Sequence, residues 1–527
     1  MTCRPSLAAS AAVRLSAGLC LSILSRSHAQ IYTATPQWQS TDATFYSTGG
    51  AVADFNRDGW PDLVVANGND IERERVVVYY NNGSGTLATT PAWQSADIAF
   101  NGHLDVADVN GDGWPDVAVA VLLAQGGPAA KVYLNNNGTL SSNPAWVSSV
   151  SQDSFGCAFG DVNADGRPDL LIASGDAYNA IAYRNVVYLN TGGTLGASPH
   201  WQTAANQNFG NCAWVDADRD GILDAAMAGT RNRSMVYRGL GGTLSTTANW
   251  QTTDTTNGFG LMVADGDVNG DGRRDLFIVD NNQLASGTGT FRQYNGLAAG
   301  YYSTAANWSY FDGYTAAVTL GDLDRDGDLD LVTGEWFGRT RYFLNTGAAL
   351  PAAPNWTSGG STTTVEKLIL ADINRNGVRR ATAFIAPQPG RRLYYLPRQP
   401  VERIIAVEID GVELPPSQWT SNREAGWVAI GVGVFPTSDV RVHYEHSLSL
   451  DLAVTNWDNN RPNQVYYNQL AVPCAADFDA DGFVSGVDFD LYVQAFEAGD
   501  FAADFDGDGF LTGVDFDMYV QAFDGGC

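Results

Sequence analysis

The chain alternates short apolar runs with turns rich in glycine, asparagine and aspartate, and this pattern returns about every fifty residues. In one unit, the apolar runs 63–66 and 76–80 are followed by an Asn/Gly turn and a Pro-x-Trp segment that ends at Trp93. The runs are short and show no helical period, which is typical of strands. Four strands per unit, repeated many times, predict an all-β propeller whose neighbouring blades bury one another's faces.

An aspartate-rich loop of the form D-x-[DN]-x-D-G-x-x-D marks each unit. Copies begin at Asp54, Asp108, Asp161, Asp216, Asp267 and Asp322, and a degraded seventh copy begins at Asp372. A tryptophan keeps the same spacing, and we expect these side chains to fill the spaces between blades. They are Trp38, Trp93, Trp146, Trp201, Trp250, Trp308 and Trp356.

The number of blades has two interpretations, seven or eight. Residues 402–447 lack the loop but read as β structure, whereas residues 448–468 match the two strands that follow a loop elsewhere. Either an eighth blade has lost its loop, or a small β insertion interrupts the closing blade of a seven-bladed ring. The segment near Trp38 precedes the first loop, so it could complete the last blade and remove the open sheet edges.

The loops predict metal sites. Each offers oxygen side chains at positions 1, 3, 5 and 9 and a carbonyl at position 7, and a flexible set of oxygen ligands favours Ca²⁺. Without a cation, the clustered carboxylates would repel one another. The predicted ligands, the seventh residue of each loop contributing its carbonyl, are Asp54, Asn56, Asp58, Trp60, Asp62, Asp108, Asn110, Asp112, Trp114, Asp116, Asp161, Asn163, Asp165, Arg167, Asp169, Asp216, Asp218, Asp220, Ile222, Asp224, Asp267, Asn269, Asp271, Arg273, Asp275, Asp322, Asp324, Asp326, Asp328 and Asp330.

The seventh loop keeps Asp372, Asn374 and Asn376, but Arg380 stands where the last aspartate should be. A guanidinium can supply the positive charge that the ion supplies elsewhere. We therefore expect this loop to hold no metal.

Residues 474–527 contain a tandem duplication of twelve-residue loops of the EF-hand type. A short helix is predicted after each loop, at 489–496 and 516–523. A domain this small needs additional restraints, which two ions and a Cys474–Cys527 disulfide would supply. The predicted ligands are Asp477, Asp479, Asp481, Phe483 through its carbonyl, Asp488, Asp504, Asp506, Asp508, Phe510 through its carbonyl, and Asp515. About eight calcium ions are expected in all.

The N-terminus predicts export. Arg4 and Arg14 precede an apolar stretch, and the small residues at 27 and 29 indicate signal-peptide cleavage before Gln30. The net charge is −28, which argues against nucleic acid as a partner. Cys157 and Cys212 occupy equivalent strand positions, and they are predicted either to pair or to be two small buried residues.

The loops and their spacing resemble the FG-GAP (VCBS) repeat family, which includes the propeller heads of α-integrins, over residues 31–396 and the strands at 448–468. The resemblance implies calcium between the first two strands of each blade and a role in adhesion, carbohydrate binding or protein recognition. The C-terminal duplication looks like a type I dockerin, which implies docking onto a cohesin-like domain. Gly486-Val487 and Gly513-Val514 depart from the hydroxyl residues usual there, so surface retention and a structural cap stay open.

The predicted domains are a signal peptide (1–29), the propeller (30–401), a β insertion or degenerate blade (402–447), closing strands and linker (448–473) and the dockerin-like domain (474–527). No catalytic constellation emerges. His443 and His446 lie three apart on a strand, so we expect surface residues rather than a metal pair. The favoured function is extracellular binding or adhesion without catalysis, free or at the cell surface. The alternative is a calcium-dependent polysaccharide lyase or hydrolase.

Overall fold

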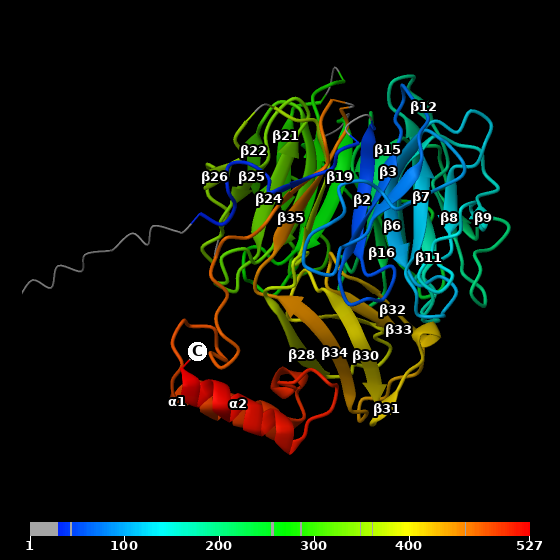
Figure 1. The fold of residues 1–527 in the computed structure, drawn as a ribbon. Coiled ribbons are helices and arrows are strands. Elements are labelled where there is room, and N and C mark those ends of the chain that lie inside the picture. The colour runs from blue at the N-terminus through cyan, green and yellow to red at the C-terminus, as the bar shows by residue number, and fades with distance from the viewer. Residues whose placement is uncertain are drawn as a thin grey trace, which may run out of the picture.

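A computed structural model of the protein describes residues 30–42, 45–254, 258–284, 287–347, 349–360, 362–458 and 460–526. The expected signal peptide (1–29) and Cys527 lie outside these residues. The described chain is built mostly from antiparallel four-stranded sheets, with two α-helices near the C-terminus (Figure 1).

Six consecutive sheets have the same order, from an inner strand that precedes the aspartate loop to an outer strand that begins at the repeating tryptophan. They comprise β2 (Ser47–Ala53), β3 (Asp62–Asn67), β4 (Val76–Tyr79) and β5 (Trp93–Gln94); β6 (Asn101–Ala107), β7 (Asp116–Val121), β8 (Ala130–Tyr133) and β9 (Trp146–Val147); β10 (Ser154–Gly160), β11 (Asp169–Asp176), β13 (Val186–Tyr188) and β14 (Trp201–Gln202), with β12 (Ile181–Ala182) added to β11; β15 (Phe209–Val215), β16 (Asp224–Gly229), β17 (Met235–Tyr237) and β18 (Trp250–Gln251); β19 (Gly260–Gly266), β20 (Asp275–Asp280), β21 (Thr290–Tyr294) and β22 (Trp308–Phe311); and β23 (Thr315–Gly321), β24 (Asp330–Glu335), β25 (Arg341–Phe343) and β26 (Trp356–Thr357).

A further sheet joins the two ends of the repeat region. Its order is β27 (Val365–Ala371), β35 (Asp451–Asn456), β36 (Gln464–Tyr466) and β1 (Trp38–Gln39). Trp38 pairs with Val465, so the N-terminal strand completes a sheet whose other strands come from the far end of the chain. This pairing confirms the predicted closure.

The inner strands contact one another in a cycle that runs β2, β6, β10, β15, β19, β23, β27 and back to β2. The fold is therefore a β-propeller. Glycines permit the close approach of these strands, since a Cβ atom at Gly49 would lie 2.8 Å from Cα of His103, and one at Gly102 would lie 2.5 Å from the Phe155 carbonyl oxygen.

The repeating tryptophans bridge neighbouring sheets, as expected. The Trp38 ring meets the Tyr79 ring edge-on, with 5.6 Å between their centroids. Its indole Nε1 donates to the carbonyl of Leu87, 2.8 Å away. Trp93 makes the corresponding contacts with Tyr133 and Leu140. These two indoles thus fill gaps between sheets and each satisfies a carbonyl there.

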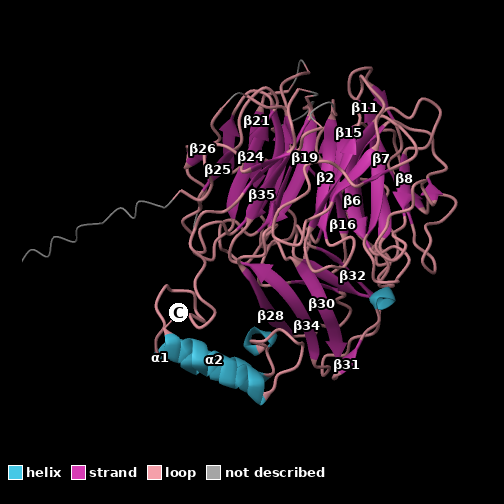
Figure 2. Cartoon of the chain, in the orientation of Figure 1, coloured by secondary structure: helices cyan, strands magenta, loops and turns pink. Residues whose placement is uncertain are grey.

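Between β27 and β35 the chain forms an inserted domain, residues 378–447. In the view of Figure 2 this domain lies directly below the propeller. Its own core includes Val407, Val428 and Val442. The domain contains two sheets, β28 (Val378–Ile385), β34 (Val440–Ser447), β30 (Arg403–Ile409) and β31 (Val412–Glu413), and β29 (Leu393–Tyr395), β33 (Trp427–Ile430) and β32 (Trp419–Asn422), with the 3₁₀ turn η1 (Pro416–Gln418).

This domain starts earlier than the sequence suggested. We expected the propeller to continue to residue 401, but β28 pairs with β34 along its whole length, from Val378 opposite Ser447 to Ile385 opposite Val440. Trp419, which lies in the segment 402–447 that could have been an eighth blade, is on β32 and pairs with Ile430 of β33. Both sheets of this region therefore pair among themselves rather than with the ring.

The C-terminal module consists of α1 (Gly486–Ala498), the 3₁₀ turn η2 (Phe501–Ala503) and α2 (Gly513–Gly525). Both predicted helices are confirmed and are longer than expected. Each begins with a capping box, Ser485 with Asp488 and Thr512 with Asp515. The rings of Tyr492 and Tyr519 stack at 3.7 Å in the small core between the two halves, and Cys474 is disulfide-bonded.

Candidate functional site

Six aspartate loops lie between the first two strands of their propeller sheets, at the end of the ring that faces the inserted domain. In the loop at Asp54, the first carboxylate accepts hydrogen bonds from the amides of Asp58 and Gly59. The loops at Asp108, Asp161 and Asp267 use the same amides. Gly59 has φ +90°, which explains the glycine at the sixth position.

The ninth aspartate of each loop is buried beneath it. Asp62 accepts hydrogen bonds from the amide of Phe55 at 3.0 Å and from that of Asn81 at 2.8 Å, and its equivalents, including Asp116 and Asp330, do the same. Burial raises the pKa of Asp62 to about 7 and that of Asp330 to about 8. Burial therefore disfavours the charged form of these carboxyl groups, and a cation nearby would favour it.

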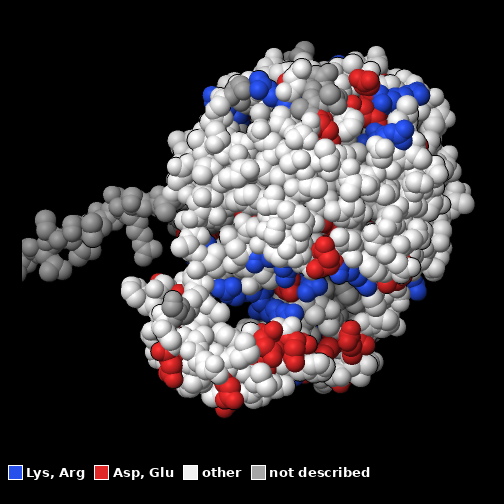
Figure 3. All heavy atoms as spheres, viewed as in Figure 1, with Lys and Arg blue, Asp and Glu red and all other residues white. Residues whose placement is uncertain are grey.

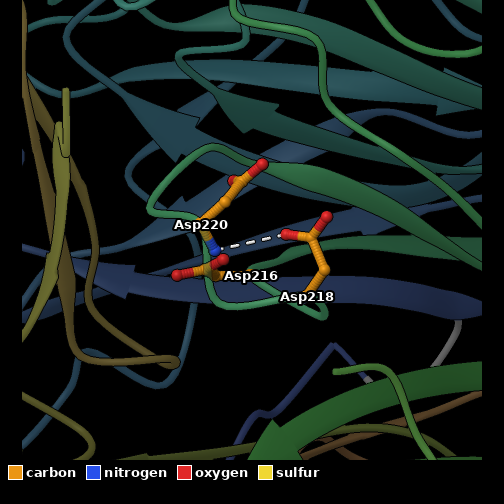
Figure 4. A group of neighbouring side chains, drawn as sticks. All are labelled: Asp216, Asp218 and Asp220. Carbon is orange, nitrogen blue, oxygen red and sulfur yellow. Dashed lines mark hydrogen bonds between the residues drawn. The ribbon is translucent and has the colours of Figure 1, made fainter. Parts of the chain in front are cut away.

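Among the described residues, four groups of predicted ligands bring oxygen atoms of three carboxylates within 4.8 Å of one another. The groups are Asp216, Asp218 and Asp220; Asp322, Asp324 and Asp330; Asp477, Asp479 and Asp488; and Asp504, Asp506 and Asp515. Figure 4 shows the first group, in which the Asp220 amide donates to Asp218 at 3.2 Å. Loops with asparagine at the third position bring fewer carboxylates together, and there Asn56 donates to Asp58 at 3.0 Å.

The donor chemistry fits a hard divalent cation. Every converging side-chain donor is an oxygen. The Asp504 side chain is fully buried, yet its Oδ1 has no hydrogen-bond partner. A buried carboxylate oxygen without a partner is costly. A cation held by Asp504, Asp506 and Asp515 would satisfy it.

The seventh loop is split by the inserted domain. Asp372 keeps the first-position bonds, with the amides of Asn376 and Gly377 donating to it. The ninth position is occupied by Asp451, which accepts from the amide of Ile373 at 2.9 Å and from that of Asn468 at 2.9 Å. These two bonds repeat those of Asp62.

Arg380 therefore does not play the role that the sequence suggested. It lies on β28, and its guanidinium pairs with Glu445 and with Asp504 of the C-terminal module rather than with Asp372. The signal that could have identified Asp451 is local: like the ninth aspartate of other loops, it stands directly before an apolar strand, here 452–454.

A pocket of about 60 Å³ lies at the opposite end of the ring, where the inner strands begin. Aromatic rings line it, among them Phe155, Tyr178, Phe259, Trp336 and Trp457. Trp336 and Trp457 stack with 5.9 Å between centroids, and Tyr178 is 46% exposed. Sequence reasoning missed this pocket, because its residues come from the segments of seven sheets and share no motif.

The pocket also contains the carboxylates of Asp70, Asp176 and Glu366, and none of the described residues that line it is a lysine or an arginine. Glu366 is buried, accepts a hydrogen bond from the Trp336 indole and lies 3.8 Å from Nε2 of His103. Burial raises the pKa of Glu366 to about 8 and lowers that of His103 to about 3. The pocket therefore suits an uncharged or cationic group and disfavours an anion.

The structure also places the two histidines of β34 and the two cysteines of the ring. His443 and His446 are buried, not surface residues, because β34 lies between β28 and β30 and His443 stacks against Phe501 at 4.0 Å. Cys157 and Cys212 are free and buried, which agrees with the interpretation as small core residues.

Comparisons with known proteins identify the repeats. The family FG-GAP_3, an FG-GAP-like repeat, matches residues 54–119, 120–172 and 267–333. Human integrin alpha-7 is 36% identical over 140 residues, which is 24% of this chain and 12% of that integrin. The rat protein of that name is 35% identical over the same length. The chain thus contains FG-GAP-like repeats similar to those of integrin α chains, but matches only a small part of these relatives.

Solved structures whose backbones follow a similar path have low sequence identity to this chain. Sqt1 of Saccharomyces cerevisiae is 7% identical with a TM-score of 0.44, covering 82% of this chain and 98% of that one. The Cps50 (Swd1) beta-propeller domain of Myceliophteria thermophila is 8% identical with a TM-score of 0.42, covering 63% and 92%. Within the described residues, neither α1 nor α2 has the length and apolar character needed to cross a membrane.

Proposed function

We propose that this protein is an exported, calcium-loaded, seven-bladed propeller that binds an extracellular protein or carbohydrate ligand without catalysis. The observation that supports the binding role is the aromatic and acidic pocket at the end of the ring opposite the aspartate loops. Stacked rings beside carboxylates suit the apolar face and hydroxyl groups of a sugar, or a basic side chain of a protein. Similarity to part of integrin alpha-7 supports an extracellular setting.

Calcium has a structural role in this proposal. Six propeller loops and two loops of the C-terminal module hold one ion each, through the residues predicted above, and the ions neutralise buried carboxylates. The split loop formed by Asp372, Asn374, Asn376 and Asp451 offers a similar but less acidic donor set. Titration calorimetry on chelator-treated protein measures the number of ions, and a stoichiometry near zero would disprove this part.

The C-terminal module is proposed to attach the protein to a cohesin-like domain or another cell-surface component. Phe483 and Phe510 occupy equivalent loop positions and are 74% and 70% exposed, and Val487 and Val514 repeat this at the helix starts. A duplicated set of exposed apolar side chains is typical of a docking surface. Replacement of Phe483 and Phe510 by serine should abolish attachment to isolated cell envelopes without altering the melting temperature.

The ligand test uses the mature protein on glycan and extracellular-protein arrays, with and without EDTA. Binding without release of product supports the proposal, whereas release of oligosaccharides would favour a polysaccharide-active enzyme. Tyr178→Ala should weaken binding at least tenfold, because it removes an exposed ring of the pocket. Phe435→Ala is the control, since Phe435 is 70% exposed but lies in the inserted domain.

A further inference from the structure

Arginines of the inserted domain lie on the first aspartates of separate metal loops. Arg391 pairs with Asp216 at 3.0 Å, and Arg398 pairs with Asp322 at 3.4 Å. Both aspartates also accept the glycine amide of their own loop, from Gly221 and Gly327 respectively, as Asp108 does from Gly113, so the arginines add to these backbone hydrogen bonds. The inserted domain thus places guanidinium groups at the sites where the proposed calcium ions would bind.

The third such contact reaches the C-terminal module. Arg380 of β28 donates to Oδ2 of Asp504, the first aspartate of the last loop. Around it, the Thr382 amide donates to Asp500 at 2.8 Å and the Phe501 amide donates to the Thr382 hydroxyl at 2.9 Å. The inserted domain therefore holds the module through β28, with Arg380 at the centre of the contact. In Figure 3, basic side chains gather in the hollow between the propeller and the module.

The two carboxylate oxygens of Asp504 have different partners. Oδ2 accepts from Arg380 and from the Gly509 amide, whereas the buried Oδ1 has no partner. Oxygen atoms of Asp504, Asp506 and Asp515 lie within 4.8 Å of one another. A cation among these carboxylates would therefore bind close to the Arg380 guanidinium, because the two share Asp504.

We propose that the inserted domain is a cation-sensitive clamp: Arg380, Arg391 and Arg398 stand in for metal charge, and calcium loading weakens their hold on the loops. The clamp rests on the proposed calcium sites. A divalent ion repels a guanidinium bound to the same carboxylate and also reduces the negative charge that attracts it. Coupling is reciprocal, so each arginine lowers the calcium affinity of its loop by the factor by which calcium weakens the contact.

The test measures stepwise calcium constants of the full mature chain by competition with a chromophoric chelator. Arg380→Gln, Arg391→Gln and Arg398→Gln should each tighten one binding step by roughly tenfold, the size expected for one charge beside a divalent ion in watery surroundings. Arg392→Gln is the matched control, because Arg392 lies in the same domain and donates to the Val432 carbonyl. Arg380→Lys keeps the charge and should retain the wild-type constants.

Melting temperatures in saturating calcium establish first that each variant is folded. If one glutamine variant does not fold, the other two carry the test. Unchanged or weaker constants in the folded glutamine variants would overturn the clamp while leaving the calcium sites intact. If the wild-type chain binds no calcium, the proposed function itself fails. Hydrogen exchange adds an independent readout. Calcium should increase exchange at the Thr382 amide more in the wild type and in Arg380→Lys than in Arg380→Gln.

Discussion

Asp451 accepts a hydrogen bond from the backbone amide of Ile373 at 2.9 Å, although the two residues lie 78 positions apart. The inserted domain lies between these two residues in the sequence, and the propeller loop still makes the hydrogen bonds of an uninterrupted loop. An insertion at this point leaves the sheet β27–β35–β36–β1 intact, because the two sides of the loop still meet.

The first prediction concerns this relationship. Asp451→Ala should lower the free energy of unfolding by about 3 kcal/mol, since it leaves two buried amides, those of Ile373 and Asn468, without an acceptor. Urea unfolding in EDTA measures the change. Asp330→Ala is the matched control in a continuous loop, and a much smaller effect for Asp451 would show that the split loop is not closed in solution.

The local part of this fold could be predicted from the sequence, and the long-range part could not. The loops, the repeating tryptophans and the C-terminal helices each depend on residues within a dozen positions, so spacing alone indicated them. The place of Asp451 depends on a sheet that joins distant segments, and the role of Arg380 depends on how β28 meets the C-terminal module. The pocket around Glu366 is likewise assembled from many sheets.

The second prediction is that chelation destabilises the protein. EDTA should lower the melting temperature by about 10 °C or more, because ions that bind only the folded chain add to its stability. Calcium should restore the original value, and magnesium should restore less of it, because the loops offer flexible oxygen ligands rather than a strict octahedron. Identical melting curves with and without EDTA would rule out structural calcium.

The third prediction is a pH dependence that arises from Glu366. Burial raises its folded-state pKa to about 8, so the folded chain holds this proton more tightly than the unfolded chain does. The resulting stability is fully present below the unfolded pKa, near 4.5, and is lost as the pH rises through 8. Glu366→Gln keeps the neutral form, so its stability relative to the wild type should increase between pH 5 and pH 8 by on the order of 3 kcal/mol.

Urea unfolding of both proteins in calcium, at several pH values, measures this difference. Asp439→Asn is a suitable control, because Asp439 is a solvent-exposed partner of Arg441. A constant difference between the wild type and Glu366→Gln across this pH range would contradict the raised pKa of Glu366.

The last prediction concerns the Cys474 disulfide. Only four described side chains of the C-terminal module's core are fully buried, those of Ala476, Tyr492, Ala503 and Tyr519, so covalent closure should contribute a large share of its stability. Cys474→Ser should destabilise the module by about 2–4 kcal/mol, through the greater freedom of its unfolded chain. Hydrogen exchange across 474–526 measures the loss, while exchange in the propeller should not change. Cys157→Ala is the matched control, because Cys157 is a free thiol in the ring. Equal exchange in the module of Cys474→Ser and of the wild type would instead show that the metal loops and the contact of Thr382 with Phe501 suffice to hold it.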